Sequence, residues 1–179
     1  VEPRRYRFRF LNGSNARFYR MFLENKVTAT PGPVFWQIGT DGGLLDVPVK
    51  LDPNDAVKPR FLLLGPGERA DIIIDFTNFA GQTLTLKNNA RTPFPKGPTP
   101  DPQTVGQIMQ FRVVLPLNGT DTSYNPATGV ALRIPMIRLV NATTGTLPQN
   151  VTVDVRRQLT LNEVMGMGGP LEVLLNNTK

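Results

Sequence analysis

Apolar and polar residues alternate along several stretches of the chain, with the period of two that marks a β-strand with one buried face. Residues 5–10 read RYRFRF, which places three aromatic side chains on one face and three arginines on the other. Residues 82–87 alternate in the same way, with Leu84 and Leu86 on the inward face. These two patterns predict half-buried strands.

Other stretches predict strands by their apolar or β-branched content between turn-forming residues. Residues 17–23 carry apolar side chains on both faces, which indicates that both sides of that strand are covered. The remaining predicted strands lie at 35–40, 61–64, 70–76, 108–115, 151–161 and 171–175. No stretch has a convincing helical period. An all-β fold, a Greek-key β-sandwich or barrel, is therefore predicted.

Two long segments lack any period. Residues 88–106 contain five prolines and are predicted to form a Pro-rich surface loop. Residues 116–150 are rich in turn residues and are predicted to form a long connection, with one short strand-like piece at 131–135. The length of 179 residues suits one core, so a single domain over 1–179 is expected.

The composition excludes several classes of chemistry. The chain has no Cys and no His. Without them it can form no disulfide, thiol nucleophile or thiolate metal site. A blue-copper site needs two His and a Cys, and catalytic zinc sites usually need His. No apolar run approaches the roughly 20 residues that span a bilayer, so no membrane partner is predicted.

The net charge of +6 is compatible with a polyanion partner. However, the arginines of residues 5–10 point away from the interleaved aromatic rings, so the two cannot form a stacking surface together. A solvated or interdomain face is the favoured interpretation, and no nucleic-acid partner is predicted. The chain enters a strand directly after Val1-Glu2-Pro3, and both ends are expected to lie within a longer protein.

Four polar residues flank predicted turns. Glu68, Arg69 and Asp71 follow a Gly-Pro-Gly turn, and Asp41 precedes two glycines. The first three could form an acid–base pair beside a guanidinium. Alternatively, Arg69 bridges loop carboxylates or carbonyls while Glu68 caps the turn. Asp41 suits a tight turn better than an ion site, because a single carboxylate falls short of a calcium loop.

Phe18 and Phe22 lie on the less protected face of the strand predicted at 17–23. Two aromatic rings on such a face favour a contact with a neighbouring domain. They are the candidate interdomain residues.

Five stretches, in order along the chain, resemble a known family. They are RRYRFRFLNGSNARFYRMFL at 4–23, FWQIGTDGGLL at 35–45, RFLLLGPGERADIIIDF at 60–76, IMQFRV at 108–113 and LTLNEVMGMGGPLEVLLNNTK at 159–179. Together they resemble the second cupredoxin-like domain of three-domain multicopper oxidases, within the group of bacterial spore-coat laccase, bilirubin oxidase and phenoxazinone synthase.

The resemblance implies a copper-free scaffold domain between a first and a third cupredoxin domain, which would be its partners. The parent enzyme would use copper to oxidise phenolic or similar reductants and reduce dioxygen to water, and it would be exported or spore-associated. No catalytic, cofactor-binding or metal residue is then expected in this chain, and the turn residues Glu68, Arg69, Asp71 and Asp41 would be structural. The main alternative is a free-standing β-sandwich module that binds carbohydrate, protein or polyanion. A hydrolase based on carboxylates is the weakest alternative.

Overall fold

The computed structural model describes residues 1–141 and 143–178, and it divides into two compact units at Met136/Ile137. Within the described residues the regular structure consists of β-strands and two short 3-10 helices, η1 (Thr77–Phe79) and η2 (Pro126–Thr128). None of these helices is long and apolar enough to cross a membrane.

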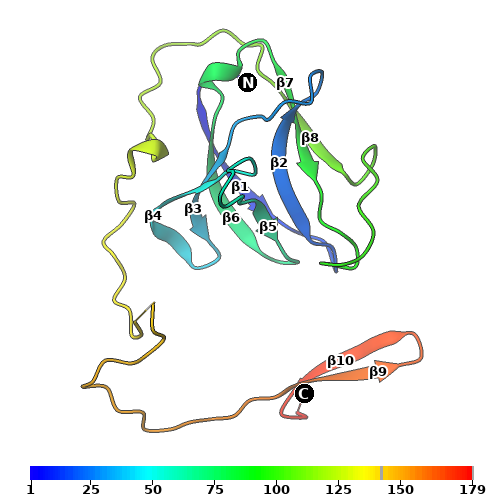
Figure 1. Ribbon diagram of the computed structural model, residues 1–179, viewed down its shortest axis with the longest axis vertical. Coiled ribbons are helices and arrows are strands. Elements are labelled where there is room, and N and C mark those ends of the chain that lie inside the picture. The colour runs from blue at the N-terminus through cyan, green and yellow to red at the C-terminus, as the bar shows by residue number, and fades with distance from the viewer. Residues whose placement is uncertain (142, 179) are drawn as a thin grey trace. The chain divides into compact units, whose positions relative to one another are not determined.

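Two four-stranded antiparallel sheets build the first unit (Figure 1). The first sheet has the order β1-β6-β3-β4, with bounds β1 (Arg5–Leu11), β6 (Arg69–Asp75), β3 (Phe35–Thr40) and β4 (Gly43–Leu51). The second has the order β5-β2-β7-β8, with bounds β5 (Leu62–Leu64), β2 (Tyr19–Asn25), β7 (Thr83–Asn88) and β8 (Gln107–Arg112). The chain crosses repeatedly between the sheets, which confirms the predicted Greek-key sandwich of cupredoxin-like type.

The core lies between the two sheets and is dominated by aliphatic and aromatic side chains. The alternation in β1 places Tyr6, Phe8 and Phe10 against it, as predicted. Phe76, which follows β6, is fully buried and lies 5.3 Å from the ring of Phe111 on the opposite sheet. The buried set includes Met21, Leu23, Phe35, Leu62, Leu64, Ile72, Ile74, Phe76, Leu84, Leu86, Phe111 and Val113.

Strand β4 was not among the predicted strands. It pairs only with β3 and forms one edge of the first sheet. Pro48 lies inside it, and a proline, which lacks an N–H to donate, is tolerated in a sheet mainly at an edge. The absence of a clear alternation around Pro48 is why the pattern did not identify this strand.

Two strand predictions were wrong. Residues 151–160 and 131–135 lie outside the strands, although the first segment alternates Val151, Val153 and Val155 with polar residues. Alternation marks a sequence that suits a sheet, but a strand forms only where a partner edge supplies its hydrogen bonds. Among the described residues, no strand lies between 116 and 160, so the connection extends beyond the predicted 116–150.

In the described part of the second unit, β9 (Leu161–Gly166) and β10 (Gly169–Leu175) form a β-hairpin, joined through Met167 and Gly168. Leu161 lies opposite Leu175, and Glu163 lies opposite Val173. Since partnered residues share a face of an antiparallel ladder, this places Leu161, Leu175 and Val173 together. The expectation of a single domain over 1–179 stays a prediction.

Candidate functional site

Glu68, Arg69 and Asp71 lie at the start of β6, and Asp41 lies in the turn between β3 and β4. Arg69 donates from its backbone N–H to Asp41 Oδ1 at 2.9 Å, and its Nε forms an ion pair with the same oxygen at 2.8 Å. Glu68 Oε2 accepts the N–H of Gly65 at 2.6 Å across the turn. These contacts tie the turn before β6 to the turn after β3.

Asp71, two residues after Arg69 on β6, pairs with an arginine of β1. Arg7 donates to Asp71 Oδ1 through Nε at 2.8 Å and to Asp71 Oδ2 through its terminal nitrogen. The hydrogen bonds that Arg7 donates to Asp71 raise the pKa of Arg7 above its ordinary value. Asp71 and Glu68 therefore do not form the acid–base pair that one interpretation of the motif required.

Asn12 is a buried polar residue whose role the sequence did not reveal beyond a turn. The residue is 4% exposed. Its Nδ2 donates to the carbonyls of Arg17 at 2.7 Å and Leu64 at 3.1 Å, while its Oδ1 accepts the N–H of Ser14 at 3.0 Å. Asn12 thus fastens the β1–β2 turn to β5.

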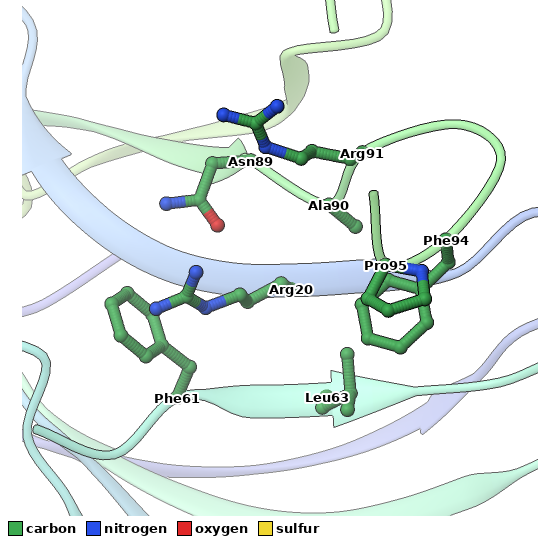
Figure 2. A pocket seen from close by; sticks show the side chains of 8 residues that line it. All are labelled: Arg20, Phe61, Leu63, Asn89, Ala90, Arg91, Phe94 and Pro95. Carbon is green, nitrogen blue, oxygen red and sulfur yellow. The ribbon is translucent and has the colours of Figure 1, made fainter. Parts of the chain in front are cut away.

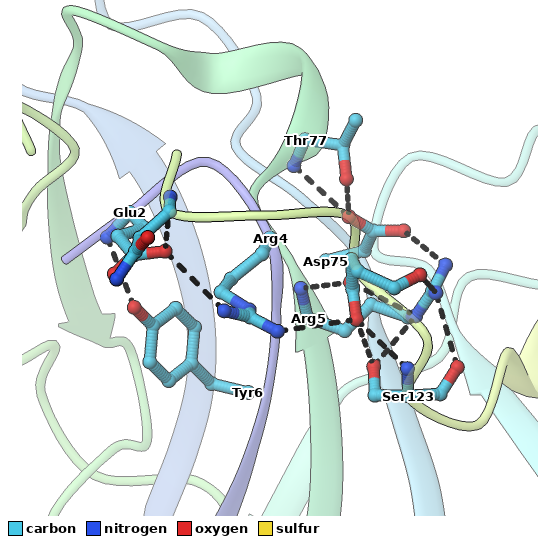
Figure 3. Close-up of polar contacts among 9 residues, drawn as sticks. Glu2, Arg4, Arg5, Tyr6, Asp75, Thr77 and Ser123 are labelled. Atoms are coloured by element: carbon cyan, nitrogen blue, oxygen red, sulfur yellow. Dashed lines mark hydrogen bonds and ion pairs between the residues drawn. The ribbon is translucent and has the colours of Figure 1, made fainter. Parts of the chain in front are cut away.

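A second polar cluster joins β1 to the long connection (Figure 3). The backbone N–H of Arg5 donates to Asp121 Oδ2 at 2.9 Å, and Arg5 Nη2 donates to the carbonyls of Asp121 at 3.2 Å and Ser123 at 3.0 Å. Arg5 also lies 3.8 Å from Asp75 of β6. No local motif in the sequence pointed to this cluster, because Arg5 and Asp121 are 116 residues apart.

The carboxyl group of Asp121 is strongly biased toward its charged form. Burial of the side chain, which is 12% exposed, would by itself raise its pKa. Hydrogen bonds from the Ser123 hydroxyl and from the N–H groups of Arg5 and Ser123, together with the charge of Arg5, outweigh burial and lower the pKa of Asp121 to about 2. The cluster is thus a charge-assisted clamp between the connection and the first sheet.

A cavity of about 390 Å³ lies on the outer face of the second sheet (Figure 2). The guanidinium of Arg20, on β2, lies 3.6 Å from the ring centroid of Phe61, which precedes β5. The predicted Pro-rich loop supplies the opposite side of the cavity. The lining residues are Arg20, Phe61, Leu63, Asn89, Ala90, Arg91, Phe94 and Pro95.

The two candidate interdomain residues each contact an aromatic ring of this cavity. Phe18 stacks on Phe94 with ring centroids 4.5 Å apart and an interplanar angle of 12°. Phe22 meets Phe61 edge to face at 6.1 Å. Both residues are half-buried, and each packs against an aromatic residue that lines the cavity.

Metal-binding clusters are absent from the described part of the chain: residues 1–141 and 143–178 contain no group of three or more His, Cys, Asp or Glu side chains that could hold an ion. Asp41, Asp71 and Asp121 each form an ion pair with an arginine, and Glu68 accepts a backbone N–H. Their arrangement suits crosslinking of the fold.

Similar proteins share both the sequence and the fold. The chain is 45% identical to a laccase of Bacillus subtilis over 126 residues, which is 70% of this chain and 21% of that protein. It is 30% identical to bilirubin oxidase of Albifimbria verrucaria over 127 residues, which is 71% of this chain and 21% of that protein. No protein-family profile matches the chain.

Among solved structures, the multicopper oxidase McoA of Aquifex aeolicus aligns over 98% of this chain and 31% of its own, with 28% identity and a TM-score of 0.60. The chain spans about a fifth of the length of the two curated relatives described above. These matches confirm the resemblance found in the sequence. The chain therefore carries a cupredoxin-like domain of the multicopper oxidase family.

Proposed function

We propose that this chain is the second, copper-free cupredoxin-like domain of a laccase-like multicopper oxidase, where it holds the flanking first and third domains in position. The parent enzyme would oxidise phenolic or similar reductants and reduce dioxygen to water. The observation that carries the proposal is the match to laccases over a segment that contains neither His nor Cys.

The side chains of this chain do not fit a copper site. Blue-copper sites use two imidazoles and a thiolate, and soft or imidazole ligands are the usual choice for copper in proteins. The carboxylates of Asp41, Asp71 and Asp121 are already paired with guanidinium groups. Copper in the parent enzyme would accordingly be held by residues outside 1–179.

Several features support a scaffold role. The Asp121 clamp fixes the long connection to the first sheet, and the Arg69–Asp41 pair joins two turns of that sheet. Such crosslinks keep a sandwich rigid, which a domain that positions its neighbours requires. The flanking cupredoxin domains are the proposed partners, with Phe18 and Phe22 as candidate contacts.

The test is the coding sequence on both sides of residues 1–179. His-X-His pairs upstream and a His-Cys-His segment downstream are expected. Closely flanking start and stop codons would overturn the proposal and favour the alternative, a free-standing binding module. The cavity on the second sheet is the feature that favours that alternative, because it needs no second domain to form.

Replacing both Phe18 and Phe22 by Ser tests the interdomain contact. In the 179-residue chain the change is expected to leave the sandwich folded, because both rings lie outside the buried core. In the parent enzyme it is expected to lower oxidase activity severalfold, since the neighbouring domain would lose two apolar contacts of about 1 kcal/mol each.

The measurements are circular dichroism of the chain and dioxygen uptake by the parent enzyme. Val57→Ser, which changes a residue that is 93% exposed, serves as the control and should leave both unchanged. Unfolding of the doubly substituted 179-residue chain would instead assign the two rings to the core.

A further inference from the structure

We infer that the cavity lined by Arg20, Phe61, Asn89 and Arg91 binds a small aromatic carboxylate that carries a hydrogen-bond donor on its ring. The inference rests on the cavity of this chain and does not depend on the oxidase activity of the parent enzyme. It assigns a ligand class to a site formed by β2, the residue before β5 and the Pro-rich loop.

Positive charge without a matching carboxylate is the first reason. Arg20 and Arg91 both line the cavity, and no acidic residue does. Arg5, Arg7 and Arg69 on the first sheet each pair with an aspartate. Among the described residues, Arg20 stacks on Phe61 and Arg91 donates only to the carbonyl of Gly97, at 3.1 Å. Two guanidinium groups therefore remain available to an anion.

Asn89 provides the second reason. Its side-chain oxygen is enclosed and accepts no hydrogen bond from the described residues. Figure 2 shows that side chain directed into the space above Arg20. A buried acceptor without a donor costs about 1–3 kcal/mol, which a ligand hydroxyl or amino group would recover. A ligand that suits this site would therefore carry a hydrogen-bond donor as well as an anionic group.

The apolar walls and the volume of the cavity indicate the remaining part of the ligand, its ring. Phe61, Phe94, Leu63 and Pro95 give the cavity apolar sides. A volume of about 390 Å³ is within the range of small-molecule sites and exceeds the space needed by one substituted benzene ring. A single ligand could match all three parts of the site. Its aromatic ring would lie between the apolar walls, its carboxylate would face the arginines, and its donor would bind Asn89.

The position of the loop is fixed before any ligand arrives. Phe94 stacks on Phe18, and the N–H of Asn89 donates to the carbonyl of Arg20 at 3.1 Å. Asn88, buried at the end of β7, donates through Nδ2 to the carbonyl of Val105 at 3.1 Å. Since the loop is anchored at both ends, ligand binding would not have to order it.

The probe is 4-hydroxybenzoate, titrated into the 179-residue chain by isothermal calorimetry at pH 7. The neutral methyl ester, which lacks the carboxylate charge, tests the contribution of the anion. Benzoate, which lacks the ring hydroxyl, tests the contribution of the hydrogen-bond donor. We expect the ester to bind at least tenfold more weakly than the acid and benzoate to bind severalfold more weakly. Absence of heat with 4-hydroxybenzoate, or equal affinity for acid and ester, would overturn the inference.

Variants locate the binding. Arg20→Met and Arg91→Gln are each expected to weaken 4-hydroxybenzoate binding at least fivefold. Arg20→Lys, which keeps the charge, should retain more of it than Arg20→Met and guards against misfolding as the cause. Asn89→Ala should make the affinity for 4-hydroxybenzoate equal to the affinity for benzoate. Arg9→Gln, an exposed arginine on the first sheet, is the matched control, and an equal loss in that variant would assign the effect to net charge and refute the site.

Discussion

Replacing Phe76 by Ala is expected to lower the free energy of unfolding by about 3–5 kcal/mol, because truncation of a buried ring leaves a cavity and removes its apolar contacts. Phe76 is 0% exposed. Its ring lies 6.0 Å from Tyr6 and 6.5 Å from Phe8 on β1, and 5.3 Å from Phe111 on β8. The ring thus joins both sheets, and its loss would remove a large part of the roughly 5–15 kcal/mol typical of a folded domain.

Urea unfolding of the 179-residue chain measures this effect. Phe94→Ala is the matched control, since Phe94 is 37% exposed and contacts the sandwich through its stacking on Phe18. A loss of about 1 kcal/mol is expected there. Equal losses for the two variants would mean that the aromatic cluster around Phe76 does not dominate the stability of the core.

Asp121→Asn is expected to lower the free energy of unfolding at pH 7 by about 2 kcal/mol. The pKa of Asp121 falls from 3.8 to about 2 in the folded chain. Each pKa unit of such a difference corresponds to about 1.4 kcal/mol of stability. Because the folded-state pKa is lowered, this contribution is complete above the unfolded-state pKa and is lost as the pH falls from about 4 to about 2.

The comparison of Asp121→Asn with the unchanged chain should therefore be made by urea unfolding at pH 7, 5, 4 and 3. The difference is expected to be largest at the two higher values and to shrink at the lower ones. Asp154→Asn changes an exposed carboxylate and should have no effect beyond about 0.5 kcal/mol at any pH. A difference that stays constant down to pH 3 would contradict a charge-based clamp.

Local patterns were sufficient for most strands and for the class of fold. The alternation in residues 5–10 predicted β1 and the inward direction of its aromatic rings, and the β-branched run at 70–76 predicted β6. A period of two is a local property, so it can be read wherever one face is buried. It failed at β4, where Pro48 interrupts the pattern, and at 151–160, where an alternating segment has no partner strand.

The family resemblance likewise followed from the order of five motifs, and the absence of His and Cys by itself limited the chemistry open to the chain. The two clusters with the most specific chemistry could not be predicted in this way. Asp121 meets Arg5 across 116 residues, and the cavity combines Arg20, Phe61 and Arg91 from three separate segments. Such contacts depend on which strands become neighbours and in what register. Strand pairing and register are set by the burial of the two inner faces of the sandwich. They therefore cannot be read from any single stretch of the sequence.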